Sequence, residues 1–144
     1  LVGAAQQIAP PTEVYAQPAN LAVARFMGYR NVLEHDVDGD AGDKVTLSGP
    51  DIRITGTRKL PLGGKRAAVA FRPEEANLVE PGLATNAIAA RVANVEYGGR
   101  DSLIDVKTVS GTVLHVRSAR QPALGDAVAV QVPVERALVY PAEQ

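Results

Sequence analysis

Cysteine is absent from this 144-residue sequence, and its absence excludes a disulfide scaffold, a thiolate metal site and a cysteine nucleophile. Long apolar runs are absent too, so no stretch has the length of a transmembrane helix. Neither sign of charge is in excess, because the sequence has 15 lysines and arginines and 16 aspartates and glutamates. The resulting net charge of −1 argues against a nucleic-acid or membrane-surface role driven by charge. Met27 is the only methionine and the chain starts at Leu1, so we expect a piece of a longer protein.

Alternating apolar residues dominate the chain from residue 32 onward. A period of two is typical of strands that bury one face, and glycine, proline and aspartate separate the runs about every 8–12 residues. The runs are Leu33/Val37, Val45/Leu47, Ile52/Ile54, Val69/Phe71, Ile88/Val92, Ile104/Val106, Leu114/Val116 and Val128/Val130/Val132. They predict an all-β barrel or sandwich, with helix largely confined to residues 11–27. Two related small barrels, one in each half, are a second arrangement that the pattern allows.

Three positions in the β region carry further detail. Residues 86–97 are too long for one flat strand because the apolar phase changes after Val92, and a bulge near residues 93–94 would reconcile the two phases. A hairpin is predicted from a strand at 103–107, a turn at Gly111 and a strand at 112–117. Pro73 has no amide proton for a ladder, so it belongs at a strand end.

The start of the chain has a different character. Residues 11–12 (PT) and Pro18 each precede a helical run, and Gly28 ends the second run. The string QIAPPTEVYAQPAN over residues 7–20, followed by VARFMG over residues 23–28, resembles the end of the ATP-hydrolysing domain in bacterial ABC importer ATPases. In that family a small all-β regulatory region comes next.

The β region resembles the same family in the order and spacing of several short motifs. These are Arg72-Pro73-Glu74, a long strand opened by Asn86 and carrying Val92, Tyr97 and Gly99, the stretch from Gly111 to Leu114, GDAVAV at residues 125–130 and ALVY at residues 137–140. The family's β region is called TOBE and looks like an OB-type barrel. Ala9 and Ala22 depart from the family's glycine and phenylalanine, and residues 34–64 match poorly. These departures leave the cargo open among polyamines, ferric iron, sulfate and related solutes.

The resemblance implies a helical tail of an ATPase domain in residues 1–30 and an OB-like TOBE domain in residues 31–144. It implies a non-catalytic regulatory and dimerisation module, within a protein that couples ATP hydrolysis to solute import. ATP, magnesium and the membrane permease subunits would bind the missing ATPase domain, at the cytoplasmic side of the inner membrane. This chain itself would bind no cofactor, metal or nucleic acid. The candidates for structural or interface roles are Arg72, Pro73, Glu74, Tyr97 and Gly99.

A small barrel that senses an oxyanion or another solute is the alternative function. A polar pocket with backbone donors would distinguish it, and the sequence shows no obvious one. An autonomous enzyme is the third class, and it lacks an assembled constellation of catalytic residues. No serine, for example, lies in the G-x-S-x-G elbow of a hydrolase.

Two segments resemble ligand-binding loops only in part. Residues 63–65 (GGK) lack the serine or threonine of a phosphate-binding loop, because Arg66 follows the lysine. Residues 36–40 (DVDGD) begin like a calcium loop, but Ala41 replaces the required glycine and Leu47 the final glutamate. We therefore interpret the first as a turn and the second as a solvated hairpin loop.

Histidine and arginine side chains complete the set of candidates. His35 and His115 lie far apart within predicted strands, which favours surface or core-edge roles over catalysis. Arg72 with Glu74 or Glu75 is interpreted as an ion pair that pins the loop between two parts of the β region. Stacked aromatics over a basic groove, as in nucleic-acid-binding OB barrels, are not indicated by this composition.

Overall fold

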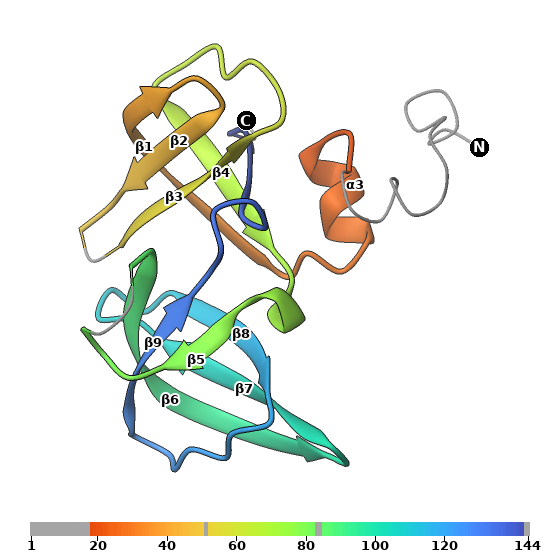
Figure 1. Ribbon diagram of the computed structural model, residues 1–144, viewed down its shortest axis with the longest axis vertical. Helices are drawn as coiled ribbons and strands as arrows, with labels where there is room; N and C mark the ends of the chain where they lie inside the picture. Colours follow the sequence, from red (N-terminus) through yellow and green to blue (C-terminus); the bar gives the residue numbers. More distant parts are fainter. Residues whose placement is uncertain (1–17, 51, 83–84, 143–144) are drawn as a thin grey trace.

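Two β units lie one above the other along the long axis of the molecule (Figure 1). This computed structural model describes residues 18–50, 52–82 and 85–142. The elements are α3 (Leu21–Phe26), β1 (Asn31–Ala41), β2 (Lys44–Ser48), β3 (Arg53–Arg58), β4 (Arg66–Phe71), the 3-10 turn η1 (Pro73–Glu75), β5 (Asn77–Val79), β6 (Ala87–Gly98), β7 (Asp101–Lys107), β8 (Val113–Ser118), β9 (Ala127–Gln131) and β10 (Leu138–Pro141). The all-β class predicted from the alternating pattern is confirmed.

The first unit is a closed barrel of five strands in the order β1-β2-β3-β10-β4. Strands β1, β2 and β3 form an antiparallel meander, and β1 also pairs antiparallel with β4 on its other side. The fifth strand, β10, comes from much later in the chain. It runs parallel to β3, pairing Leu138 with Thr57, and antiparallel to β4, pairing Leu138 with Ala70. The first unit is therefore complete only when β10 is in place.

The second unit is a five-stranded sheet in the order β5-β9-β6-β7-β8. Its two edge strands, β5 and β8, curl toward each other and are in contact. After β8, the Arg120 guanidinium donates to the carbonyl oxygen of Leu78 on β5 at 2.9 Å, which bridges the remaining gap. This sheet is a second, nearly closed barrel, so residues 31–142 hold two small barrels, the second arrangement that the sequence pattern allows.

The local predictions for the second unit are confirmed. The pairing of β6 with β7 shifts register between Val92 and Asn94, where the sequence predicts a bulge. β7 and β8 form the predicted hairpin, with Gly111 in the turn at a φ of 94°. Pro73 lies outside the strands, in the first position of η1 after β4. The helical run that the sequence places before Pro18 lies outside the described residues.

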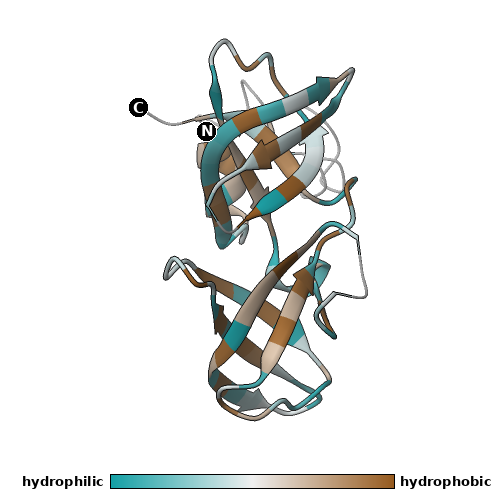
Figure 2. Cartoon of the chain, turned by 90° about the vertical axis from the view of Figure 1, so that its left-hand side faces the viewer, coloured by the Kyte–Doolittle hydropathy of each residue, from teal (hydrophilic) through white to brown (hydrophobic). Residues whose placement is uncertain are grey.

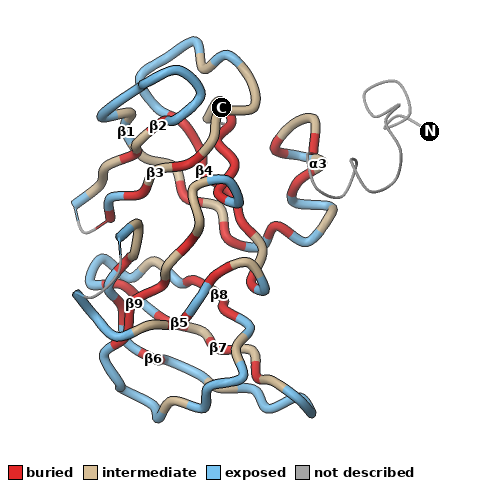
Figure 3. The backbone as a smooth tube through the Cα atoms, in the orientation of Figure 1, coloured by how far each residue is buried: buried red, intermediate tan, exposed pale blue. Residues whose placement is uncertain are grey.

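The apolar faces of the strands meet inside the two units. Figure 2 shows hydrophobic and hydrophilic positions alternating along the strands, and Figure 3 shows buried positions concentrated on the strands of both units. Leu47 and Ile54 in the first unit and Ile104 and Leu114 in the second are among the fully buried side chains. Buried residues from both units form one continuous cluster, so the two cores are joined.

Candidate functional site

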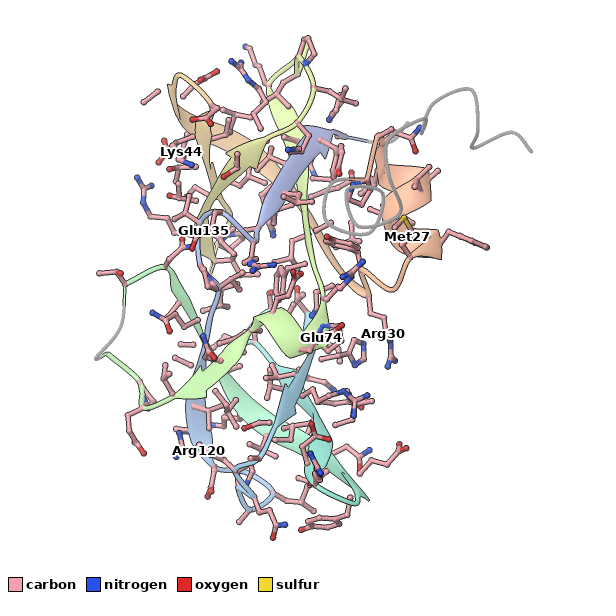
Figure 4. The ribbon with its side chains drawn as sticks, turned by 45° about the vertical axis from the view of Figure 1, so that its right-hand side comes forward. Met27, Arg30, Lys44, Glu74, Arg120 and Glu135 are labelled. Atoms are coloured by element: carbon pink, nitrogen blue, oxygen red, sulfur yellow. The ribbon has the colours of Figure 1, made fainter. Side chains whose placement is uncertain are left out.

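The junction between the two units carries the Arg72-Pro73-Glu74 motif. Pro73 is buried at the first position of η1, where a missing amide proton costs nothing. The Glu75 side chain accepts a hydrogen bond from the Arg72 amide at 3.2 Å and so caps the turn. Glu74 points outward and is exposed, as Figure 4 shows at the right of the junction. The motif therefore builds the crossover from β4 to β5.

Arg72 lies over a buried aromatic ring. Its guanidinium carbon is 4.6 Å from the centroid of the Tyr29 ring, in cation–π geometry. Tyr29 is 1% exposed, and burial raises its pKa, with the nearby Glu75 carboxylate adding to the effect. The Tyr29 side chain thus stays neutral beneath the Arg72 guanidinium. The stack connects the segment after α3 to the crossover between β4 and β5.

An ion pair at this junction involves Glu75, one of the two acidic residues singled out in the sequence. Glu75 pairs with Arg136, at 3.4 Å between Oε2 and Nη1, and the Glu75 side chain is only 13% exposed. Arg136 lies in the second crossover, between β9 and β10. The Glu75–Arg136 ion pair therefore joins the two crossovers, and Arg72 stacks on Tyr29 beside it.

Tyr97 and Gly99 lie away from this junction, at the tip of the β6–β7 hairpin. The Tyr97 residue is 67% exposed to solvent, and it lies opposite Ser102 in the pairing of β6 with β7. Gly99 adopts a φ of 73° in the turn that follows, a conformation that suits glycine. The five candidate residues therefore form two separate groups, one structural and one on the surface.

Helix α3 is fixed to the outside of the first barrel. Asn20 caps it by accepting from the Val23 amide at 2.9 Å. Its buried face is Leu21 and Ala24, whereas Phe26 is 92% exposed. A second apolar cluster comprises Leu21, Ala24, Tyr29, Ala68, Ala70, Leu138 and Tyr140. The small alanines on β4 allow the helix to approach the barrel closely.

Tyr140 ties the segment before α3 to the barrel. Its hydroxyl donates to the Pro18 carbonyl oxygen at 2.6 Å in a buried position. Burial raises the pKa of Tyr140, and the neighbouring Tyr29 raises it further. Residues 18–29 are thereby held by apolar packing and by a buried hydrogen bond to the first unit.

A cleft of about 450 Å³ opens beside the junction. Its charged lining residues are Asp43, Lys44, Lys59, Glu75, Glu135 and Arg136, and Tyr29, Thr57 and Leu138 complete the wall. Lys44 and Glu135 are labelled in Figure 4. Both signs of charge are present in equal number, so the cleft suits a polar solute and favours neither cations nor anions.

Residues 36–40, which begin like a calcium loop in the sequence, form a row of ion pairs with arginines. Asp36 and Asp40 pair with Arg66 at 3.5 Å and with Arg58 at 3.4 Å, and Asp38 pairs with Arg53. Over the described ranges, no three acidic, histidine or cysteine side chains gather as a metal site would require. Residues 36–40 thus lie on strand β1 and not in the hairpin loop predicted for them, and their carboxylates pair with arginines of β3 and β4.

His115 makes a hydrogen bond within the second unit. Its Nδ1 lies 2.6 Å from the Asp105 carboxylate, on the paired residue of β7. The pair is partly buried, and no local pattern in the sequence predicts Asp105 as the partner of His115. Residues 63–65 lie between β3 and β4, in the turn predicted for them, and are largely exposed.

Two asparagines at the junction were missed as functional residues. Asn31 and Asn86 appear in the sequence only as the openings of long strands. In the structure each side chain bonds to a backbone in the other unit. The one local signal is a polar residue directly before an apolar alternating run, which many strands share.

Comparison with known proteins identifies the family. A family model of the TOBE domain matches residues 69–139. The spermidine/putrescine import ATP-binding protein PotA of Rubrobacter xylanophilus is 32% identical over 151 residues. The chain belongs to the TOBE region of ABC importer ATP-binding subunits. This confirms the resemblance seen in the sequence motifs.

Further relatives of the TOBE region carry different cargo names. The sn-glycerol-3-phosphate import ATP-binding protein UgpC of Paraburkholderia xenovorans is 33% identical and matches 92% of this chain. The Fe(3+) ions import ATP-binding protein FbpC 1 of Rhizobium meliloti is 32% identical and matches 82%. The match to PotA of Rubrobacter xylanophilus includes 95% of this chain but only 38% of PotA. It thus spans well under half the length of these relatives.

A solved structure supports the OB-like architecture of the TOBE region. The cytoplasmic molybdate-binding protein ModG, in a form with molybdate bound, matches with a TM-score of 0.64 over 78% of this chain and 96% of that chain. The two sequences are 15% identical, so the likeness shows the fold alone. Among the described residues, no helix is long and apolar enough to cross a membrane.

Proposed function

We propose that this chain is the non-catalytic regulatory module of an ABC importer ATP-binding subunit. The docking of α3 on the first barrel carries the proposal. Residues 18–28 resemble the end of the ATPase domain, and they are packed into the barrel wall through Leu21 and Ala24. A segment continuous with the ATPase domain is thus a structural part of the β module. Motion of one part would then displace the other.

The strength of this connection follows from the buried groups. Burial of a leucine such as Leu21 contributes about 2 kcal/mol, and the Tyr140 hydrogen bond adds about 1 kcal/mol. Together these contributions, about 3 kcal/mol, correspond to a ratio of roughly 150 to 1 in favour of the docked helix, and a ligand or partner of ordinary affinity could still shift this equilibrium. A docked helix of this strength suits a regulatory contact.

The partners follow from the same proposal. Two ATP-binding subunits would remain associated through a contact between their TOBE regions while the catalytic halves open and close. The ATPase domain, with ATP and Mg²⁺, would contact the membrane permease subunits at the cytoplasmic side of the inner membrane. The cargo is one of the solute classes of the family, with polyamines favoured by the PotA relatives.

A matched pair of substitutions on α3 tests the coupling in the full-length protein. Ala24→Glu puts a carboxylate into the contact with the barrel, where Ala24 is 0% exposed. Ala22→Glu puts the same group on the exposed side of the same helix. We expect Ala24→Glu to lower solute uptake per ATP hydrolysed while ATP affinity stays unchanged, and Ala22→Glu to behave like the parent. Equal coupling ratios in both variants would contradict the regulatory role.

The isolated chain offers a direct test of the non-catalytic role. Holding a nucleotide takes a cradle of backbone amides, a lysine and groups that order magnesium. We expect no change in melting temperature with millimolar Mg-ATP and no phosphate release, since a ligand of the native state raises the melting temperature by mass action. An ATP-dependent shift, or turnover by the chain alone, would refute the proposal.

A solute sensor is the second candidate, and the charged cleft at the junction favours it. The cleft lies between the segment after α3 and the barrel, so a solute bound there would act on the same contact. Melts with spermidine, sulfate and glycerol 3-phosphate, each compared with Lys59→Ala, test this candidate. A saturable shift that Lys59→Ala abolishes would support it, and identical curves for every solute would exclude it at the concentrations used.

A further inference from the structure

The two β units repeat the same strand pairing. In the first unit β1 pairs with β2 and β4, β2 pairs with β3, and β10 pairs with β4. In the second unit β6 pairs with β7 and β9, β7 pairs with β8, and β5 pairs with β9. Strands β1 to β4 therefore correspond to β6 to β9, and β10 corresponds to β5.

The correspondence holds at the level of single residues. The first long strand of each unit is bulged, between Val37 and Gly39 in β1 and between Val92 and Asn94 in β6. The residue pairs beside the two bulges correspond as well. They are Thr46 with Thr55, whose hydroxyl oxygens are 2.7 Å apart, and Asp105 with His115, joined at 2.6 Å.

The crossovers that lead into β5 and β10 correspond too. The Glu75 amide donates to the Arg72 carbonyl oxygen at 3.0 Å, and the Arg136 amide donates to the Pro133 carbonyl oxygen at 2.9 Å. Glu75 and Arg136 thus occupy equivalent positions, and they form an ion pair with each other at 3.4 Å. Contact between equivalent residues is the mark of a two-fold axis. An approximate two-fold axis therefore relates the units and passes near this pair.

Two asparagines form reciprocal contacts about this axis. Asn31 Nδ2 donates to the His115 carbonyl oxygen and Asn31 Oδ1 accepts from the His115 amide, both at 2.7 Å. Asn86 Nδ2 donates to the Thr55 carbonyl oxygen at 3.0 Å and Asn86 Oδ1 accepts from the Thr55 amide at 2.7 Å. Each asparagine opens the first strand of its own unit and holds the third strand of the other. At both places the side-chain amide makes the pair of hydrogen bonds to the backbone that a neighbouring strand would make in a sheet.

We propose that Asn31 and Asn86 are a pair of clamps that fix the two β units in one orientation about the approximate two-fold axis. The TOBE family model begins at residue 69, so strands β1 to β3 of the first unit lie outside it. The clamps hold the two units together as a single rigid body. A movement of α3 would then be transmitted through both units to the β6–β7 hairpin. This holds whether or not the chain regulates an ATPase.

The burial of the clamps explains why they hold. Asn31 is 1% exposed, so without its amide the backbone groups of His115 would face the junction unpaired. Asn86 adopts a φ of 54°, which aims its side chain at Thr55 and also lets Nδ2 donate to the Val132 carbonyl oxygen at 2.6 Å. Asparagine tolerates this left-handed conformation better than most residues. Both positions thus combine shape and hydrogen bonding.

Asn31→Ala and Asn86→Gly test the clamps in the full chain. Glycine suits the backbone at residue 86, so Asn86→Gly removes the side chain and keeps the turn. Asn77→Ala, at an exposed position of β5, is the matched control. We expect hydrogen exchange of the His115 amide to rise about fivefold in Asn31→Ala and that of the Thr55 amide in Asn86→Gly, the effect of one lost hydrogen bond. The control should leave both amides unchanged.

A distance measurement separates a clamp from a merely stabilising residue. The sequence has no cysteine, so Lys65→Cys in the first unit and Lys107→Cys in the second accept a pair of spin labels without background. We expect one narrow distance distribution in the parent and the Asn77→Ala control, and a broad one in the clamp variants. A narrow, unchanged distribution in folded clamp variants would overturn the proposal. Should Asn31→Ala fail to fold, Asn86→Gly decides the question alone.

Discussion

Gly56 is the position at which one added methyl group should open the first barrel. It lies on β3, opposite the point where β10 enters the sheet. A Cβ at this position would lie 2.5 Å from the Ala137 carbonyl oxygen and 2.8 Å from Val139 Cγ2. The first of these contacts is with backbone, so β10 itself would have to move.

The expected cost of Gly56→Ala follows from these contacts. Overpacking costs about 1–3 kcal/mol. Displacing β10 also weakens the bonds from the Thr57 amide to Ala137 O, at 2.7 Å, and from the Lys59 amide to Val139 O, at 2.9 Å, each contributing about 1 kcal/mol. The lower entropy of an unfolded chain with alanine offsets about 0.4–1 kcal/mol. The net loss is about 2–4 kcal/mol, or about 10 °C in melting temperature.

Gly64→Ala is the matched control for this measurement. Gly64 lies in the turn before β4, and nothing is within 4 Å of a Cβ built there. Thermal melts of both variants, with hydrogen exchange at the Thr57 and Lys59 amides, give the comparison. We expect Gly64→Ala to melt like the parent and Gly56→Ala to melt earlier, with faster exchange at both amides. Melting temperatures within about 1 °C of each other would refute the reasoning, since 1 kcal/mol corresponds to several degrees.

Two further predictions concern the α3 contact. Burial raises the pKa of Tyr140 above the ordinary value of a tyrosine, about 10, so stability should be complete below about pH 10 and fall as the pH rises further, because the unfolded chain releases the phenolic proton first. Tyr140→Phe should flatten that alkaline loss in pH-dependent urea titrations, and an unchanged slope would contradict the assignment. Deleting residues 1–30 should lower the melting temperature by several degrees, since it removes Leu21, Ala24 and Tyr29 from the second apolar cluster. An unchanged melting temperature and oligomeric state would argue against docking.

The strands of the second unit were predictable because each obeys a local rule. A period of two places Ile104 and Val106 on one face, and a change of phase reveals the bulge after Val92. The helix was harder, because α3 has only six residues and two apolar faces. The barrel buries Leu21 and Ala24, whereas the larger Phe26 is exposed, and the size of an apolar side chain alone does not predict which face is buried.

The sequence pattern allowed two related barrels, but the correspondence between their residues and the asparagine clamps could not be predicted from it. The two units share backbone register and bulge positions, but equivalent side chains differ, as Thr46 and Thr55 differ from Asp105 and His115. The bonds of Asn31 and Asn86 reach residues 84 and 31 positions away in the chain. No periodicity reports such contacts, because they depend on how two finished barrels meet.

The return of β10 to the first barrel sets an order for assembly on the ribosome. Strands β5 to β9 are consecutive, so the second unit has all its strands once Gln131 has emerged. The first unit, although made earlier, must wait for Leu138 and its neighbours before β3 and β4 gain their last partner. At synthesis rates of about 5–20 residues per second, the earlier barrel stays open for several seconds. The nascent chain thus finishes its second half before its first, with the edges of β3 and β4 exposed to chaperones in the interval.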